Sequence, residues 1–578
     1  MTVISDAGKN LRIFITTFAA AFVLALLLVP LPAMAESGGQ EKISGLSPEE
    51  ALVLGEKMYV HGVLPSGKPM QAMVQGDIPV EGSKFTCANC HQRSGFGSAE
   101  GTIKTPPIDG TRLYEPTSQF KGIPLKKHPT TPDAQPDQSF RPAYTDETLA
   151  RVLLTGQDPS GRQINETMPK YFLNESDMAV MVYYLKHLST GLQPGVSETG
   201  LRFATVVTED VPQKDRETML RLLDPYLKNW RISRNQERMA RTEAFIREGA
   251  TRDVRKFSLA RWELKGPEET WREQLEAYYR KDPVFALLGG ITTGDWAPIH
   301  RFCEDHRIPA IFPLTDFPVI AETNWYTLYL SKGLYQEGEA AARYLNSDRS
   351  LKKNAVVQVF RKNRKGLVLA KAFEETWTGL GRKAPKNVAL DLDKALTRDF
   401  WKDLANRNKQ STILLWLEAK DFPDLEGLAK VKAVPRALFA SFSLLGHAAY
   451  SLPEKQRGLV YLTYPYTLPK DSGRYRESVE KMIKDGESQG PDLFMGYKMQ
   501  ALRLALNGPL SMMRTYVYRD YFLEMIDETA DLSMIPVPYP RLSFGPGQRY
   551  ASKGCYIVQL GKGPEPELIS RSEWVISD

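Results

Sequence analysis

The segment Cys87-Ala88-Asn89-Cys90-His91 places two cysteines three positions apart, with a histidine directly after them. In this pattern both thiols can form thioether bonds to a haem, and the histidine becomes an axial ligand of the iron. The pentapeptide therefore predicts one covalently bound haem c. Cys87 and Cys90 would attach it, and His91 would be the proximal iron ligand.

Two other kinds of site share this cysteine spacing. A redox dithiol belongs between a strand and a helix of a βαβ unit, whereas this motif precedes Gly95-Phe96-Gly97 and a proline-rich segment. A zinc site needs a second ligand pair, and Cys303 and Cys555 are distant and lack the spacing. These surroundings favour haem. They leave open whether Cys303 and Cys555 form a disulfide.

The second axial ligand is predicted to be Met168, which stands in a polar loop directly before Pro169. A thioether ligand favours reduced iron, so the haem should be low-spin with a relatively high potential, which suits electron transfer. Met178 and Met181 fall in an apolar-periodic segment, where methionine commonly fills core gaps. Three histidines could replace Met168, none of them in an equivalent loop: His61, His128 and His187.

Together these features resemble class I cytochromes c. Leu46–Glu50 looks like a capped helix start, and Gly55 and Tyr59 stand where that family brings its first and last helices together. Pro106-Pro107 resembles the segment whose carbonyl orients the proximal histidine. The resemblance implies an all-α domain over residues 36–190. Its last helix would be capped by Asn174 or Ser176, with Val180, Tyr184 and Leu188 on the inner face.

The chain begins with an export signal pattern. Lys9 and Arg12 precede an apolar run from Ile13 to Val29 and the AxA-type site Ala33-Met34-Ala35. We expect cleavage after Ala35 and a periplasmic protein. The competing interpretation is an uncleaved anchor in the inner membrane, for which the run is slightly short. Export agrees with haem c, which is attached on the outer side of the bacterial inner membrane.

The length and net charge of the chain limit its number of domains and its kinds of binding partner. The 578 residues exceed one ordinary domain, and 42% hydrophobic content can build proper cores. A net charge of +6 is mild for this length and argues against a nucleic-acid partner. Basic residues gather between Lys121 and His128, where they could steer an acidic redox partner toward the haem.

After a linker at 191–200, short apolar strands alternate with amphipathic helices, which predicts βαβ units and parallel sheets. The expected helices run from about Lys214 to Trp230 and from Trp271 to Arg280. Two Rossmann-like lobes fit the length better than one very wide sheet. The expected strands are Phe203–Val207, Phe257–Leu264, Val284–Gly289, Ala355–Phe360, Thr412–Trp416, Ala437–Ser441 and Leu459–Tyr464.

This region resembles type I periplasmic solute-binding proteins of the leucine/isoleucine/valine-binding kind. The resemblance lies in Phe285–Thr293, Arg307–Pro313, the crossing segment Tyr329–Tyr344, and Tyr497 with Ala501–Leu506. It implies a bilobal α/β domain with a hinge over 201–578. The first lobe would comprise about 201–328 and 456–530, and the second about 329–455 and 531–578.

A ligand would lie at the strand ends, where backbone N–H groups and hydroxyls can hold an anionic group. By matching position, the candidate ligand-binding residues are Gly290, Thr292, Thr293, Thr315, Ser441, Ser443, Tyr464 and Tyr466. The first strand, however, leads into the acidic loop Val207-Thr208-Glu209-Asp210-Val211-Pro212, where amino-acid binders of the family have glycine and serine. This departure argues against ordinary carboxylate recognition there.

We therefore expect an exported monohaem c-type cytochrome that transfers single electrons and is fused to a solute-binding-like domain. Its partners would be a periplasmic redox protein and an unknown small molecule, and no catalytic residue is expected. Two alternatives are a receptor that delivers solute to an inner-membrane permease of the ABC type, with an accessory haem, and the electron-accepting subunit of a periplasmic dehydrogenase. A peroxidase is not expected, because a His/Met iron has no open position.

Overall fold

The computed structural model describes the chain from residue 42 to residue 576, with gaps. The expected signal segment and the Lys121–His128 cluster lie outside the described residues. No helix within the described part is long and apolar enough to span a bilayer. The described ranges are 42–100, 103–118, 140–230, 255–320, 324–422, 435–471, 473, 477, 479–481, 493–513, 516–531, 539–540, 542–545 and 547–576.

The chain forms two compact units, one comprising residues 1–118 and 137–190 and the other residues 119–136 and 191–578. The helices of the first unit are α2 (Pro48–His61), α3 (Cys87–His91), α4 (Gly110–Tyr114), α5 (Asp146–Thr155) and α6 (Glu175–His187). Its strands are β1 (Gln71–Val74), β2 (Ile78–Glu81), β3 (Ala99–Glu100), β4 (Ile103–Lys104), β5 (Thr117–Ser118), β6 (Phe140–Arg141) and β7 (Lys170–Tyr171).

The two long helices of the first unit, α2 and α6, begin at the capping residues that the sequence predicted. Ser47 and Glu50 form a reciprocal capping box at the start of α2, and Asn174 caps α6 by accepting from the Asp177 N–H. The two helices pack closely, because a Cβ added to Gly55 would come within 2.4 Å of the Tyr184 Cβ. The expected crossing of first and last helices is therefore present.

The expectation of an all-α first domain is wrong in part. An antiparallel sheet with the order β2-β1-β7 accompanies the helices. Strands β1 and β2 are joined by Gln75-Gly76-Asp77, in which Gln75 and Gly76 have positive φ. Such a turn lets two short strands pair, but strands of only four residues give little alternation by which to recognise them.

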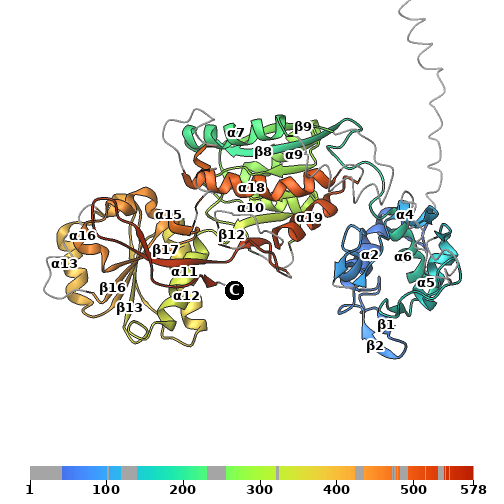
Figure 1. Cartoon of the computed structure of the whole chain (residues 1–578), viewed down its shortest axis with the longest axis horizontal. Coiled ribbons are helices and arrows are strands. Elements are labelled where there is room, and N and C mark those ends of the chain that lie inside the picture. Colours follow the sequence, from blue (N-terminus) through green and yellow to red (C-terminus); the bar gives the residue numbers. More distant parts are fainter. Residues whose placement is uncertain are drawn as a thin grey trace, which may run out of the picture. The chain divides into compact units, whose positions relative to one another are not determined.

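The second unit contains two mostly parallel sheets, as the strand–helix alternation predicted (Figure 1). The first sheet has the order β18-β12-β11-β10-β8-β9, and all its pairings are parallel. Its strands are β8 (Gly200–Thr208), β9 (Lys256–Leu264), β10 (Ala286–Leu288), β11 (Ala310–Ile311), β12 (Thr327–Ser331) and β18 (Tyr550–Ser552). The helices with it are α7 (Gln213–Lys228), α9 (Trp271–Lys281), α10 (Ala297–Asp305), α18 (Leu493–Met512) and α19 (Arg519–Asp531).

The second sheet has the order β14-β13-β15-β16-β17-β19-β20, with β21 also paired to β19. Its parallel strands are β13 (Val356–Arg361), β14 (Lys386–Leu390), β15 (Thr412–Trp416), β16 (Ala437–Ser441) and β17 (Val460–Tyr464). Its antiparallel edge is β19 (Gly554–Leu560), β20 (Leu568–Ser570) and β21 (Val575–Ile576). The helices are α11 (Leu334–Ser347), α12 (Arg364–Gly379), α13 (Arg398–Arg407), α15 (Phe442–Leu445) and α16 (Glu454–Arg457).

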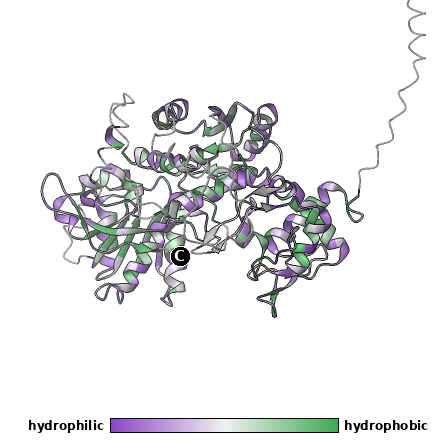
Figure 2. Cartoon of the chain, turned by 45° about the vertical axis from the view of Figure 1, so that its right-hand side comes forward, coloured by the Kyte–Doolittle hydropathy of each residue, from purple (hydrophilic) through white to green (hydrophobic). Residues whose placement is uncertain are grey.

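The central strands of both sheets are buried on both faces. Successive residues of β8 join different cores, with Phe203 and Val207 in one cluster and Ala204 and Val206 in another. Parallel sheets require this double cover because helices cross over each face. Figure 2 shows hydrophobic residues concentrated in the strands of the two sheets.

The chain segments that form each lobe differ from those expected. Strand β17 lies in the second sheet although 456–530 was expected in the first lobe, and β18 lies in the first sheet although 531–578 was expected in the second. The chain passes from the first sheet to the second at Lys332–Gly333, returns to the first between β17 and β18, and passes to the second again at Lys553–Gly554. Which sheet a buried strand joins depends on long-range pairing, which its apolar pattern does not encode.

Replacing Gly55 by leucine should destabilise the first unit by about 1–3 kcal/mol, because the new side chain would overlap Tyr184. Far-UV circular dichroism during urea unfolding would measure the effect. The nine tryptophans all lie beyond residue 190, so tryptophan fluorescence reports on the second unit and should not change. Gly379→Ala is the control, since no atom lies within 4 Å of its added Cβ. Equal stability of Gly55→Leu and the parent would contradict the helix packing.

Candidate functional site

The cysteine motif forms a short helix of its own, α3. Thr86 caps this helix by accepting a hydrogen bond of 3.2 Å from the Asn89 N–H. Cys87 and Cys90 are therefore one helical turn apart, and neither forms a disulfide. This arrangement presents both sulfurs from one turn of helix.

His91 is the buried member of the motif, with 7% of its surface exposed. Its Nδ1 lies 3.0 Å from the carbonyl oxygen of Pro106. A carbonyl only accepts, so Nδ1 carries the proton and Nε2 keeps its lone pair for a metal. Burial also lowers the pKa of His91, which favours the neutral, ligating form. The predicted orienting role of the Pro106-Pro107 segment is thus matched by a direct contact.

The Met168 loop is anchored close to α3. The side-chain oxygen of Asn165 accepts 2.9 Å hydrogen bonds from the Thr167 N–H and hydroxyl, and the Met168 N–H donates to the Asn165 carbonyl over 3.0 Å. Three residues later, the hydroxyl of Tyr171 lies 3.6 Å from Cys87 Sγ. Met168 and Cys87 are both partly buried against the same hydrophobic core.

The alternative histidine ligands lie elsewhere. His61 and His187 are exposed ends of α2 and α6, and His187 Nδ1 bonds the Tyr183 carbonyl of its own helix over 2.7 Å. His128 lies outside the described residues.

The chemistry of the donor set fits a haem better than the other sites considered. Burial raises the pKa of the Cys87 thiol to about 11, whereas the reactive cysteine of a redox dithiol has a lowered pKa. Within the described ranges, no cluster of three or more histidine, cysteine or acidic side chains could hold a metal ion. Cys87, Cys90, His91 and Met168 are the residues that would hold a haem.

In the second unit, the candidate ligand-binding residues predicted for the first lobe lie near the end of β8. Gly290 has φ +94°, and an added Cβ would lie 2.8 Å from Trp296, so no larger residue fits. Thr292 is buried, and its hydroxyl accepts from the Gly294 N–H at 3.0 Å. Thr293 is exposed and donates its hydroxyl proton to Asp210.

At this edge of the first sheet, the threonine hydroxyls already donate hydrogen bonds to Asp210 of the acidic loop. Its two carboxylate oxygens accept from Thr208, over 2.5 Å, and from Thr293. An anionic ligand at this position would lose these donors and face a like charge. The structure therefore gives a physical basis for the expected departure from carboxylate recognition by this loop.

A pocket between the lobes gathers other candidates. Thr315 contributes from the first lobe, and Ser443 and Tyr466 contribute from the second. Tyr464 packs behind Tyr466 with ring centroids 5.6 Å apart, and Ser441 is fully buried, where it caps α15. Gly290, Thr292 and Thr293 do not line this pocket. The pocket has a cavity volume of about 40 Å³, which is enough for a few water molecules. The lobes must therefore separate to admit a larger solute.

Sequence reasoning missed most of the polar lining of this pocket. The missed residues come from the loop after β11, the crossing into α11, the helix α18 and a late loop, and they are Asp316, Ser331, Gln336, Lys498 and Tyr539. No local pattern marks them, because they are far apart in sequence and only the chain crossings bring them together.

Arg364, at the start of α12 in the second lobe, forms ion pairs with two acidic residues of the first lobe. It contacts Asp295, and its distance to Glu268 is 3.7 Å. Its guanidinium also lies 4.5 Å from the ring centroid of Phe317. These contacts hold the lobes together across the cleft.

Several solved structures are similar in fold. A solute-binding protein of an ABC transporter from R. palustris, in complex with benzoate, is 13% identical, with a TM-score of 0.48 over 66% of this chain and 98% of its own. A substrate-binding protein from Sphaerobacter thermophilus is 15% identical, with a TM-score of 0.48 over 66% and 99%. A leucine-binding protein from Thermotoga maritima is 13% identical, with a TM-score of 0.44 over 65% and 99%.

No protein-family model and no curated protein matches this sequence. The second unit itself has two mostly parallel sheets with a pocket between them.

Replacing Arg364 by methionine should weaken lobe closure by about 0.2–1 kcal/mol, the usual worth of partly exposed ion pairs. The open-to-closed ratio would rise by up to about fivefold, measured as a distance distribution between spin labels on the two lobes. High salt should have the same effect on the parent protein. Lys371→Met is the control, because the ion pair of Lys371 among the described residues is with Glu375, within α12 itself. An unchanged distribution for Arg364→Met would contradict this role.

Proposed function

We propose that this protein is an exported monohaem c-type electron-transfer protein whose second unit binds a small molecule between two α/β lobes. The observation that supports the haem most directly is the contact of His91 Nδ1 with the Pro106 carbonyl, 3.0 Å long. It orients a neutral imidazole directly after Cys90, on the same short helix as Cys87, and neither cysteine forms a disulfide. That combination supports haem attachment.

The residues of the first unit have separate tasks in this proposal. Cys87 and Cys90 attach the group, His91 ligates the iron from the proximal side, and Met168 ligates it from the distal side. When bound, the haem supplies reversible one-electron chemistry, and a thioether ligand favours its reduced form. A periplasmic redox protein would be the partner, attracted in part by the basic segment Lys121–His128.

The pocket between the lobes supports the small-molecule part of the proposal. Arg364 holds the lobes together across the cleft, so a ligand enclosed there would change the balance between open and closed forms. A receptor that delivers its solute to an inner-membrane ABC permease is the second candidate function, and the same pocket favours it. A subunit that takes electrons from a periplasmic dehydrogenase would use only the first unit.

Met168→Leu should abolish the weak far-red absorption band of a thioether–iron bond in the oxidised protein and lower the haem potential. Both would be measured on full-length protein from a host that matures c-type cytochromes. Met178→Leu is the matched control, because it makes the same side-chain change in the core of α6. A band that persists in Met168→Leu would refute this ligand. A colourless parent protein without the added mass of haem would refute the whole haem assignment.

Coupling between the units is a separate prediction that follows from their covalent fusion. Saturation with a bound solute should change the haem potential or the rate of electron transfer to a partner. Both would be measured with and without solute in the parent protein. If neither quantity changes although solute binds, the receptor function stands and coupling is discarded.

A further inference from the structure

A buried tyrosine hydroxyl lies beside the sulfur of Cys87. Tyr171 is the second residue of β7 and has 3% of its surface exposed. Its hydroxyl oxygen is 3.6 Å from Cys87 Sγ and 3.3 Å from the carbonyl oxygen of Phe85. Burial raises the pKa of this hydroxyl well above its ordinary value, so the oxygen keeps its proton at neutral pH.

The hydrogen bonding of this pair must change when a thioether forms. In the haem-free chain, the Cys87 thiol can donate to the tyrosine oxygen while the tyrosine proton is directed to the Phe85 carbonyl. Attachment replaces the S–H bond by an S–C bond, and the proton passes to the second carbon of the haem vinyl group. The sulfur then has lone pairs and no proton, so it can only accept a hydrogen bond.

The Phe85 carbonyl competes only weakly for the tyrosine proton. An O–H···O hydrogen bond is usually about 2.5–3.0 Å long, and the distance to this carbonyl, 3.3 Å, lies beyond that range. The longer distance to Cys87 suits the larger sulfur atom. A hydroxyl that kept its proton on Phe85 would also direct an oxygen lone pair at the sulfur lone pairs, which repel it. After attachment, rotation of the hydroxyl toward Cys87 is therefore favoured.

We propose that Tyr171 donates a hydrogen bond to the Cys87 sulfur of the haem-loaded protein and thereby raises the haem potential. This inference rests on the haem function proposed above. Reduced haem carries one more electron than oxidised haem, so the positive end of an O–H dipole at the attachment point favours the reduced form. Burial preserves this effect, because a low local dielectric strengthens it. Tyr171 is thus a positioning residue that acts through Cys87.

The test compares Tyr171→Phe with the parent, both as full-length protein from a host that matures c-type cytochromes. The variant keeps the ring and removes the hydroxyl. Its potential should be lower, so that the ratio of reduced to oxidised haem at a fixed solution potential falls by about two- to fivefold, part of the worth of one neutral hydrogen bond. Tyr183→Phe is the matched control, because the Tyr183 ring packs on His187 of its own helix, with centroids 4.3 Å apart.

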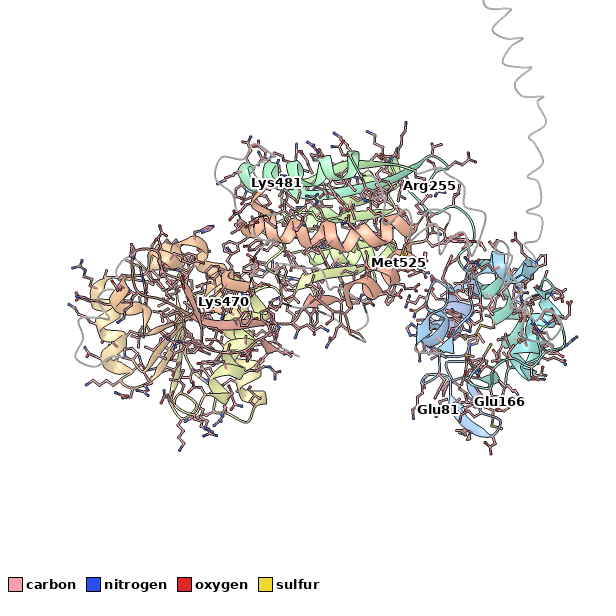
Figure 3. All side chains as sticks on the ribbon, in the orientation of Figure 1. Glu81, Glu166, Arg255, Lys470, Lys481 and Met525 are labelled. Carbon is pink, nitrogen blue, oxygen red and sulfur yellow. The ribbon has the colours of Figure 1, made fainter. Side chains whose placement is uncertain are left out.

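Two readouts separate this role from a merely structural one. The far-red band of the Met168–iron bond should remain in Tyr171→Phe, and its lowered potential should persist at high salt, because salt screens a buried contact poorly. Glu166→Gln is the comparison, since it removes an exposed charge from the loop that leads to Met168 (Figure 3). Its effect on the potential should disappear at high salt.

The carbon–sulfur stretching band in the resonance Raman spectrum reports on the sulfur directly. Transfer to D₂O should shift this band more in the parent than in Tyr171→Phe. An absent shift in the parent, equal shifts in both proteins, an unchanged or raised potential, or loss of the far-red band in Tyr171→Phe would each overturn the hydrogen bond and leave the haem function intact. A parent protein that carries no haem would instead refute the haem function itself.

Discussion

The side-chain amide of Gln336 joins two of the three places where the chain passes between the sheets of the second unit. Its oxygen accepts from the Lys332 N–H at 3.2 Å, and its nitrogen donates to the Gly554 carbonyl at 3.0 Å. Beside it, Lys332 and Glu339 form a buried ion pair of 3.1 Å, and Lys332 lies over the ring of Tyr550. Buried polar contacts of this kind are costly to break, so they define how the two lobes meet.

The pocket depends directly on this junction, because Gln336 and Gly333 are part of its wall. A Cβ on Gly333 would lie 2.4 Å from the Asp316 carbonyl, so the approach of the crossing segment to the first lobe requires glycine. The same segment leads into α11, whose Glu337 accepts hydrogen bonds from Ser443 in the wall formed by the second lobe. Movement at the junction would therefore change the walls of the pocket together, which connects ligand binding to lobe closure.

The first unit brings the loop that carries Met168 close to the helix that carries Cys87, Cys90 and His91. Close packing of α2 on α6 at Gly55 forms the frame, and the Pro106 carbonyl fixes the ring of His91. The hairpin of β1 and β2 adds the strand on which β7 pairs, and β7 follows Met168 directly. Sheet pairing and the Tyr171 contact with Cys87 thus bring the methionine loop to the cysteine helix.

Features that depend on near neighbours in the chain could be predicted from the sequence. The cysteine–histidine motif, the caps Ser47 and Asn174, and the strand–helix alternation after residue 200 are local, because capping and periodicity act over a few residues. Only the tertiary structure decided that β17 and β18 exchange lobes, that Asp210 closes off Thr293, and that Lys498 meets Asp316 and Ser443 in one pocket. These depend on strand pairing and chain crossings over hundreds of residues, whose energies come from packing and leave no local pattern.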